Sequence, residues 1–129
     1  MFRALSSDKL PQPRFRYSQC IQAGSYYQIA GLVALDPLTG RLEVGGPGAE
    51  ARKILGNLVA ALPDFSLKLG DMVIARIFTT RFDRFGDINA AWDEVFAPPA
   101  PAPARTSVGV DALPLGATVE MEFGFYKES

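Results

Sequence analysis

The segment Met72–Thr79 places the strongest constraint on the fold, because it alternates like a β-strand and is apolar on both faces. Apart from Arg76, apolar side chains occupy both predicted faces: Met72, Ile74 and Phe78 on one, and Val73, Ala75 and Ile77 on the other. A strand that is apolar on both sides needs a covering layer on each side of its sheet. How much of that cover the chain supplies itself depends on its helices.

Two segments have the spacing of amphipathic helices. The first, Pro47–Leu62, starts at a proline suited to the first helical turn and stops before Pro63. The second begins after Asp83, a predicted N-cap, and ends before Pro98. The predicted buried stripes are Ala51, Ile54, Leu55, Leu58, Val59 and Leu62 in the first helix, and Phe85, Ile88, Asn89, Trp92, Val95 and Phe96 in the second. Two helices can cover one face, so we expect another copy of the chain to cover the second.

Four further segments are predicted strands: Tyr17–Ala23, Tyr26–Leu35, Pro103–Val110 and Thr118–Tyr126. The first two flank a two-residue turn and form a predicted hairpin. The stretch Met1–Phe15 shows no period and is predicted to be an extended arm. The resulting order, β-β-α-β-α-β-β, predicts an α+β fold in which two helices pack on one face of a mixed sheet, in a single domain of residues 1–129.

The last two predicted strands carry the candidate functional residues. In Pro103–Val110, Arg105 and Ser107 alternate with two valines, so Arg105 is predicted to lie on the face away from the apolar one. Its guanidinium could bind a carboxylate bidentately, or it could simply solvate the strand end. In Thr118–Tyr126, Glu120 and Glu122 share the face opposite an apolar row. Two such carboxylates raise each other's proton affinity, unless one of them pairs with an arginine.

Composition excludes several classes of chemistry. The chain has no histidine, which excludes Ser-His-Asp and Cys-His catalysis and most zinc sites. A formal net charge of −1 gives no basic field for nucleic acid or anionic lipid. The single cysteine, Cys20, is expected to act as a small apolar residue in a reducing compartment. With no apolar run long enough for a membrane span and no signal-peptide pattern, the chain is expected to be cytoplasmic.

An ordered set of residues resembles the RidA/YjgF family, the reactive intermediate deaminases that are often labelled endoribonuclease L-PSP-like. The set runs from about Tyr17 to Phe125, and its most specific part is Pro103-Ala104-Arg105 followed by the acidic strand Val119–Glu122. The other matching elements are Ala30-Gly31, the turn Lys68–Asp71 and the helix with Asn89. The resemblance implies a chorismate-mutase-like (YjgF) fold assembled as a homotrimer, with three clefts between subunits.

The resemblance also implies an activity: hydrolysis of a 2-imino or enamino acid to a 2-keto acid and ammonia, without a cofactor or metal. It implies that Arg105 binds the substrate carboxylate and that Glu120 activates or orients the attacking water. Tyr17 and groups near Ala30, Gly31 and Ser107 would shape the pocket. From the residues alone, Glu120 could equally be a solvated strand residue, and Tyr17 a half-buried aromatic.

The sequence departs from the family pattern at the predicted pocket. Ala30 stands where a serine is common, Ser107 where a cysteine is common, and Phe15-Arg16 where the best-studied branch has Gly-Pro. Given these changes, a larger substrate of the aminomuconate type remains an alternative, with Arg16 as a second positive charge near the pocket. A non-catalytic trimer that binds a 2-keto acid is a further alternative. Ribonuclease activity, suggested by the family label, has little support in an acidic chain without histidine.

Overall fold

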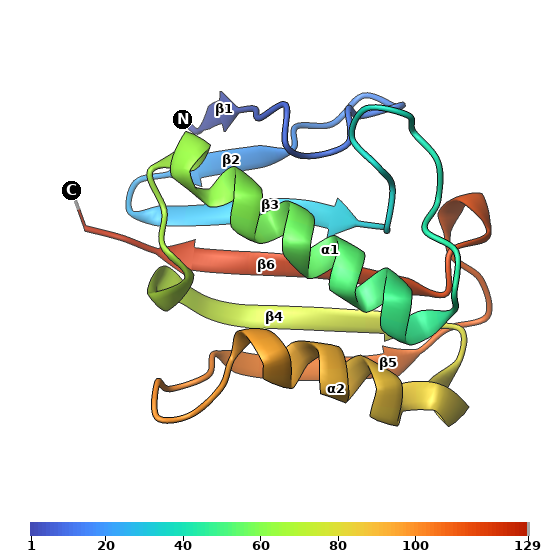
Figure 1. Cartoon of the computed structure of the whole chain (residues 1–129). Helices are drawn as coiled ribbons and strands as arrows, with labels where there is room; N and C mark the ends of the chain where they lie inside the picture. The colour runs from blue at the N-terminus through green and yellow to red at the C-terminus, as the bar shows by residue number, and fades with distance from the viewer. Residues whose placement is uncertain (129) are drawn as a thin grey trace.

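The sheet brings together strands that are far apart in the sequence (Figure 1). The computed structural model describes residues 1–128, which form a six-stranded mixed sheet in the order β1-β2-β3-β6-β4-β5. The strands are β1 (Arg3–Leu5), β2 (Cys20–Ala23), β3 (Tyr26–Leu32), β4 (Met72–Thr79), β5 (Ala104–Gly109) and β6 (Val119–Tyr126). Strands β4 and β5 pair in parallel, and the other neighbours pair antiparallel. The predicted α+β class and mixed sheet are therefore confirmed.

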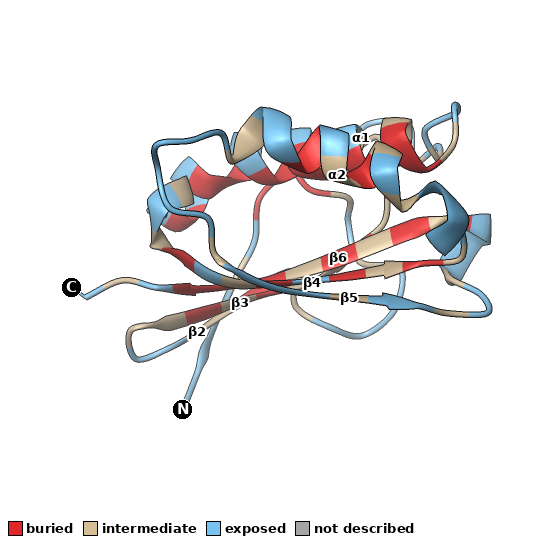
Figure 2. Ribbon diagram, turned by 90° about the horizontal axis from the view of Figure 1, so that it is seen from below, coloured by how far each residue is buried: buried red, intermediate tan, exposed pale blue. Residues whose placement is uncertain are grey.

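Helices α1 (Pro47–Ala61) and α2 (Phe85–Val95) pack against each other on the same face of the sheet, as predicted (Figure 2). The opposite face carries neither helix, and we call it the open face. Helix α1 starts at the predicted proline and passes into a 3-10 turn at Leu62. Within residues 1–128, no helix combines the length and the apolar character that crossing a membrane requires.

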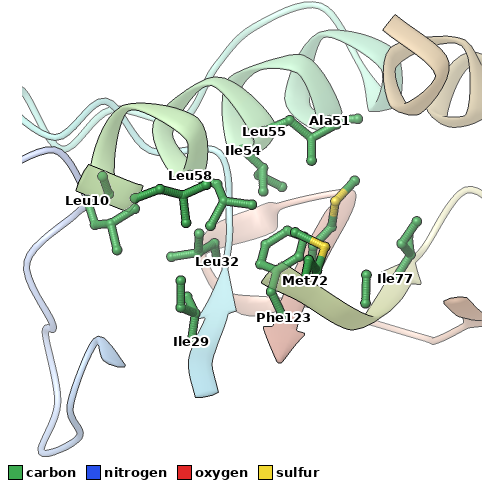
Figure 3. Close-up of a cluster of buried hydrophobic side chains, with 14 of the residues drawn as sticks. Leu10, Ile29, Leu32, Ala51, Ile54, Leu55, Leu58, Met72, Ile77 and Phe123 are labelled. Atoms are coloured by element: carbon green, nitrogen blue, oxygen red, sulfur yellow. The ribbon is translucent and has the colours of Figure 1, made fainter. Parts of the chain in front are cut away.

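The core lies between the helices and the sheet (Figure 3). Its largest fully buried side chains include Ile54, Leu55 and Leu58 of α1 and Phe123 of β6. Every second residue of β6 from Val119 to Phe125 is fully buried, which confirms the predicted alternation. The predicted stripe of α1 is wrong at Val59, which is 44% exposed because it lies at the margin of the face centred on Leu55 and Leu58.

Cys20 belongs to this core. It is fully buried in β2, and burial raises the pKa of its thiol to about 11. A thiol that stays protonated and out of contact with solvent is a poor nucleophile. This environment agrees with the expected role of a small apolar residue.

The N-terminal part of the sheet differs from the prediction. Three strands, not two, precede α1, because Arg3–Leu5 pairs with β2; a segment of three residues is too short to show a period. Strand β2 begins at Cys20 and not at Tyr17. The side chain of Gln19 accepts a hydrogen bond from the Ser7 amide (2.7 Å) and donates one to the Pro11 carbonyl (3.0 Å). Gln19 thereby holds the preceding arm against the sheet.

Strand β4 has the predicted bounds, but Met72 lies on the other face. The register against β6 shifts between Met72 and Ile74, so Met72 is buried under the helices together with Ala75 and Ile77. Such a bulge breaks the two-residue alternation at one point, which a pattern of apolar residues cannot reveal. Ile74 and Phe78 remain on the open face, as half-buried side chains.

The predicted N-cap of α2 is wrong. Residues Phe82–Arg84 form a 3-10 turn, and α2 begins at Phe85 without a side-chain cap. The Asp83 carboxylate instead accepts two hydrogen bonds from the guanidinium of Arg81, at 3.0 and 2.9 Å. The charge-assisted pair with a neighbouring arginine replaces the capping hydrogen bond.

Candidate functional site

A cavity of about 590 Å³ lies where the loop before β2, the end of β3 and the segment before β6 meet. It is lined by Pro11, Gln12, Arg14, Phe15, Tyr17, Gln19, Ala30, Gly31, Leu32, Val33, Leu35, Pro114, Leu115 and Glu120. The fold thus brings four of the predicted site residues, Tyr17, Ala30, Gly31 and Glu120, to one cavity from segments that are distant in the sequence. Most of the other lining side chains are apolar.

Glu120 is the carboxylate of this cavity. It stands on the open face of β6, opposite Phe78 of β4, and is half-buried. Burial, and secondarily the nearby charge of Glu122, raise the pKa of Glu120 above its ordinary value. Within residues 1–128 the Glu120 carboxylate accepts no hydrogen bond, whereas Glu122 pairs with Arg76 at 3.1 Å. Glu120 is therefore a partly desolvated carboxylate that is free to accept a proton.

Gly31 provides the space that Glu120 occupies. A Cβ atom on Gly31 would lie 3.0 Å from Cδ of Glu120 and would overlap one of its carboxylate oxygens. The register between β3 and β6 shifts between Ile29 and Leu32, so Ala30 and Gly31 leave the regular ladder beside this carboxylate. A glycine at this bulge lets the two strands hold the carboxylate against the backbone of β3.

Arg105 lies elsewhere. In β5, at the edge of the sheet, it pairs in register with Ala75, on the same face as the helices. Its Cζ atom lies 5.6 Å from the ring centre of Phe85 and 5.1 Å from that of Trp92. Among residues 1–128 no carboxylate oxygen lies within 4.0 Å of it, although Arg52, Arg76, Arg81 and Arg84 all form such pairs. The two rings orient the guanidinium and leave its N–H groups free for a ligand.

The predicted orientation of Arg105 is therefore wrong in one respect. The side chains of β5 alternate as predicted, but the two faces are exchanged. Arg105 and Ser107 face the helices, and Val108 faces the open side. Helix α2 covers the inner side of this edge strand with aromatic rings, and an exposed arginine can lie over those rings. An edge strand that is only partly covered need not put its apolar residues inward.

A single chain does not bring Arg105 and Glu120 together. Arg105 is in register with Ala75, and Glu120 with Phe78, on the opposite faces of strands that flank β4. Two inter-strand spacings and three residues along the strands separate their Cα atoms by roughly 14 Å. Ser107 lies in register with Ile77, on the same face as Arg105. The predicted site residues thus form two groups: Tyr17, Ala30, Gly31 and Glu120 at the cavity, and Arg105 and Ser107 on the edge strand.

The sequence analysis does not mark several residues at these two places as site residues. Leu115 and Arg14 line the cavity, and Arg14, not Arg16, supplies its positive charge; one Nη atom of Arg14 donates to the Gly40 carbonyl at 2.9 Å. Phe85 and Trp92 lie against Arg105, whereas their helical spacing predicts only that they belong to a buried stripe. Their aromatic character and helical spacing could have indicated a platform, whereas nothing in the pattern marks Leu115. Among residues 1–128, no group of three or more His, Cys, Asp and Glu side chains is arranged to hold a metal ion.

Comparison with known proteins shows similarity along nearly the whole chain. The family model described as Endoribonuclease L-PSP matches residues 7–124. A protein of Dermatophagoides farinae named 2-iminobutanoate/2-iminopropanoate deaminase is 34% identical over 120 residues, which cover 93% of this chain and 92% of that protein.

Solved structures give the same result. RidA from an Antarctic Psychrobacter superposes with a TM-score of 0.88 at 31% identity, covering 97% of this chain and 99% of its own. TdcF of E. coli, solved with bound serine, superposes with a TM-score of 0.91 at 25% identity, covering 98% and 99%. The matched regions include both groups of candidate site residues.

Proposed function

We propose, from the premise that this chain belongs to the endoribonuclease L-PSP (RidA/YjgF) family, that it hydrolyses 2-imino acids to 2-keto acids and ammonia. The observation that carries the proposal is Glu120, a carboxylate with a raised pKa and no hydrogen-bond partner within residues 1–128, in a largely apolar cavity. A relative is named for this reaction, and TdcF is named with a bound amino acid, which has the carboxylate of such a substrate.

The reaction needs one group that can both take and give a proton. In the first step, Glu120 takes a proton from water as the water oxygen bonds to the carbon of the protonated imine, and the C=N electron pair moves to nitrogen. In the second step, Glu120 returns the proton to the amino nitrogen. The C–N bond then breaks, the hydroxyl oxygen forms the carbonyl, its proton goes to Glu120 or solvent, and ammonia leaves. A carboxyl with a raised pKa holds a proton more readily than an exposed glutamate does, which suits a group that must both take and return one.

Arg105 supplies the carboxylate anchor from a second subunit of a homotrimer. The imine carbon of a 2-imino acid is bonded directly to its carboxylate, so one substrate cannot span the roughly 14 Å and the two sheet faces between Glu120 and Arg105 of one chain. The open face also carries apolar side chains that water would contact in a monomer, including Val108, which is 39% exposed. A second copy that covers this face and brings its Arg105 to the cavity explains both features.

Mixing two inactive variants tests the shared site. Arg105→Ala and Glu120→Gln should each lose most imine hydrolysis while remaining trimeric in light scattering. After joint unfolding and refolding, random assembly restores both wild-type residues in up to about a quarter of the sites. The matched control mixes wild-type protein with the double variant, and this mixture should hydrolyse imine no faster than the same amount of wild-type protein alone. Absence of any gain in the mixed trimer, or a monomeric wild type, would contradict the shared site.

Ligand affinity separates catalysis from binding. In a titration with 2-ketobutyrate, Arg105→Ala should weaken binding by at least about ten-fold, since charge-assisted hydrogen bonds contribute roughly 1.5–3 kcal/mol each. Arg105→Lys keeps the charge but loses the planar fork, so its affinity should lie nearer to alanine. Glu120→Gln should keep the affinity and slow turnover. If wild-type protein binds 2-ketobutyrate but does not accelerate the loss of 2-iminobutyrate, the chain is instead a metabolite-binding trimer. Ala30 motivates this comparison, because it has no hydroxyl group to hold substrate or water.

A further inference from the structure

Leu115 lines the cavity in a backbone conformation that leucine rarely adopts. Between Pro114 and Gly116 it has φ 62° and ψ 21°, in the left-handed region. Asparagine tolerates this region through local hydrogen bonds, but leucine has no compensating group. The leucine side chain is nevertheless 51% exposed at the cavity. A strained conformation that presents a large apolar side chain at a cavity points to a function for that side chain.

The rest of the wall is suited to an apolar ligand group. Phe15, which is 81% exposed, and Val33 line the same cavity, and Ala30 adds no hydroxyl. The Gln19 amide is occupied by Ser7 and Pro11, and Arg14 donates to the Gly40 carbonyl. Glu120 is therefore a half-buried carboxylate in a cavity whose lining side chains are mostly apolar.

We infer that this cavity selects 2-imino acids with bulky apolar side chains, branched aliphatic or aromatic, and that Leu115 determines the preference. The inference rests on the proposed imine hydrolysis. The side chain of the bound imine covers Leu115 and Phe15, while its imine carbon lies at Glu120. An apolar pocket discriminates between substrates that differ by one or more methylene groups by about ten-fold or more in kcat/KM. A cavity of about 590 Å³ has ample room for such a side chain.

Competition among imines tests the substrate class. Imines are generated by an amino-acid oxidase from leucine, phenylalanine, alanine and glutamate, and their consumption is followed with and without the protein. The imines made from leucine and phenylalanine should be hydrolysed with kcat/KM values at least about ten-fold above the value for the imine made from alanine. Equal values, a preference for the alanine product, or a preference for the dicarboxylic glutamate product through Arg14 would overturn the inference and leave imine hydrolysis intact. No acceleration for any imine would instead overturn the proposed function, and this inference with it.

A single substitution tests the residue. Leu115→Asn removes the apolar group and keeps a residue that suits the left-handed backbone. The kcat/KM for the imine made from leucine, divided by the kcat/KM for the imine made from alanine, should fall at least about ten-fold. Leu38→Asn, at a leucine that is 94% exposed and outside the cavity, is the matched control and should leave the ratio unchanged. Thermal unfolding and light scattering accompany both variants. An unchanged ratio in a Leu115→Asn protein that keeps the fold and assembly of wild type would show that Leu115 does not act on the substrate.

Discussion

Gly31 and Glu120 are in direct contact between the adjacent strands β3 and β6. An ideal Cβ on Gly31 would lie 3.0 Å from Cδ and 3.3 Å from Cγ of Glu120, and still closer to a carboxylate oxygen. Real Cβ atoms do not approach other atoms so closely, so any side chain at position 31 must displace this carboxylate. The position of the candidate catalytic group therefore depends on a missing side chain in the neighbouring strand.

Gly31→Ala should reduce activity much more than stability. The atoms that the new methyl group meets belong to the flexible end of Glu120, which can move away without disturbing the backbone. We expect the free energy of unfolding to stay within about 1 kcal/mol of wild type. Imine hydrolysis should fall by about ten- to a hundred-fold, because a small misplacement of a catalytic group is costly. Urea unfolding and kcat/KM measure the two quantities, and full activity would show that the carboxylate position is not critical.

Gly56→Ala is the corresponding change at a glycine where a new methyl group would meet no other side chain. Gly56 is exposed within α1, and apart from its chain neighbours and the nearby helix backbone, no heavy atom would lie within 4 Å of a Cβ atom there. Alanine loses less backbone entropy on folding than glycine, so the variant should be more stable by about 0.5–1 kcal/mol. Its activity should equal that of wild type, which makes it a control for the Gly31 variant. A lower denaturant midpoint would show that α1 is not free to accept a side chain at this position.

A buried carboxylate in α1 fixes the start of β6. Glu50, which is 3% exposed, accepts hydrogen bonds from the Thr118 amide (2.8 Å) and the Val119 amide (3.3 Å), and its other oxygen lies 2.7 Å from the Thr118 hydroxyl. Glu50→Gln keeps these partners if the hydroxyl turns to accept from the new amide, so stability should change by less than about 1 kcal/mol. Glu50→Ala leaves the amides without an acceptor and should cost about 1–3 kcal/mol in urea unfolding. Equal stabilities of the two variants would contradict this role.

The sequence is sufficient to predict the elements with long, regular patterns. Strand Met72–Thr79 and the alternation of β6 are correct because a half-buried strand repeats every second residue and a helix stripe repeats every third or fourth. Strand β1 has three residues, which is too few for a period. The orientation of Met72 depends on a bulge, and that of Arg105 on how far α2 covers an edge strand. Both are tertiary effects that leave no mark in the local sequence.

The candidate site could be predicted only in part, for related reasons. Tyr17, Ala30, Gly31 and Glu120 line one cavity, and only the family resemblance groups these positions, because no local pattern links them. The separation of Arg105 from Glu120 follows from strand order and register, which alternation does not specify. Leu115 is significant because of a positive φ angle in a leucine, and φ cannot be read from residue identity.

The raised pKa of Glu120 predicts how stability depends on pH. The folded protein binds this proton more tightly than the unfolded chain does, since burial and Glu122 raise the pKa above its ordinary value of 4.5. Stability is therefore lost as the pH rises from about 4.5 through the folded pKa, and the loss is complete above it. Glu120→Gln should unfold at a higher temperature than wild type at neutral pH. The difference should shrink as the pH falls below 4.5, and a difference that grows on acidification would reverse the assigned direction.

The same carboxyl should set the acid limb of the imine-hydrolysis rate. Only the ionised Glu120 can take a proton from water, so kcat/KM should fall on acidification with a midpoint above 4.5. Glu122→Gln removes the smaller cause of the raised pKa and frees the positive charge of Arg76, and both effects move the midpoint to lower pH. The midpoint should stay above 4.5 if burial, the larger cause, outweighs the freed Arg76. Asp93→Asn removes the same charge from an exposed position on α2 and should leave the midpoint unchanged. Equal shifts in the two variants would mean that the midpoint follows net charge, and that Glu122 has no specific effect on Glu120.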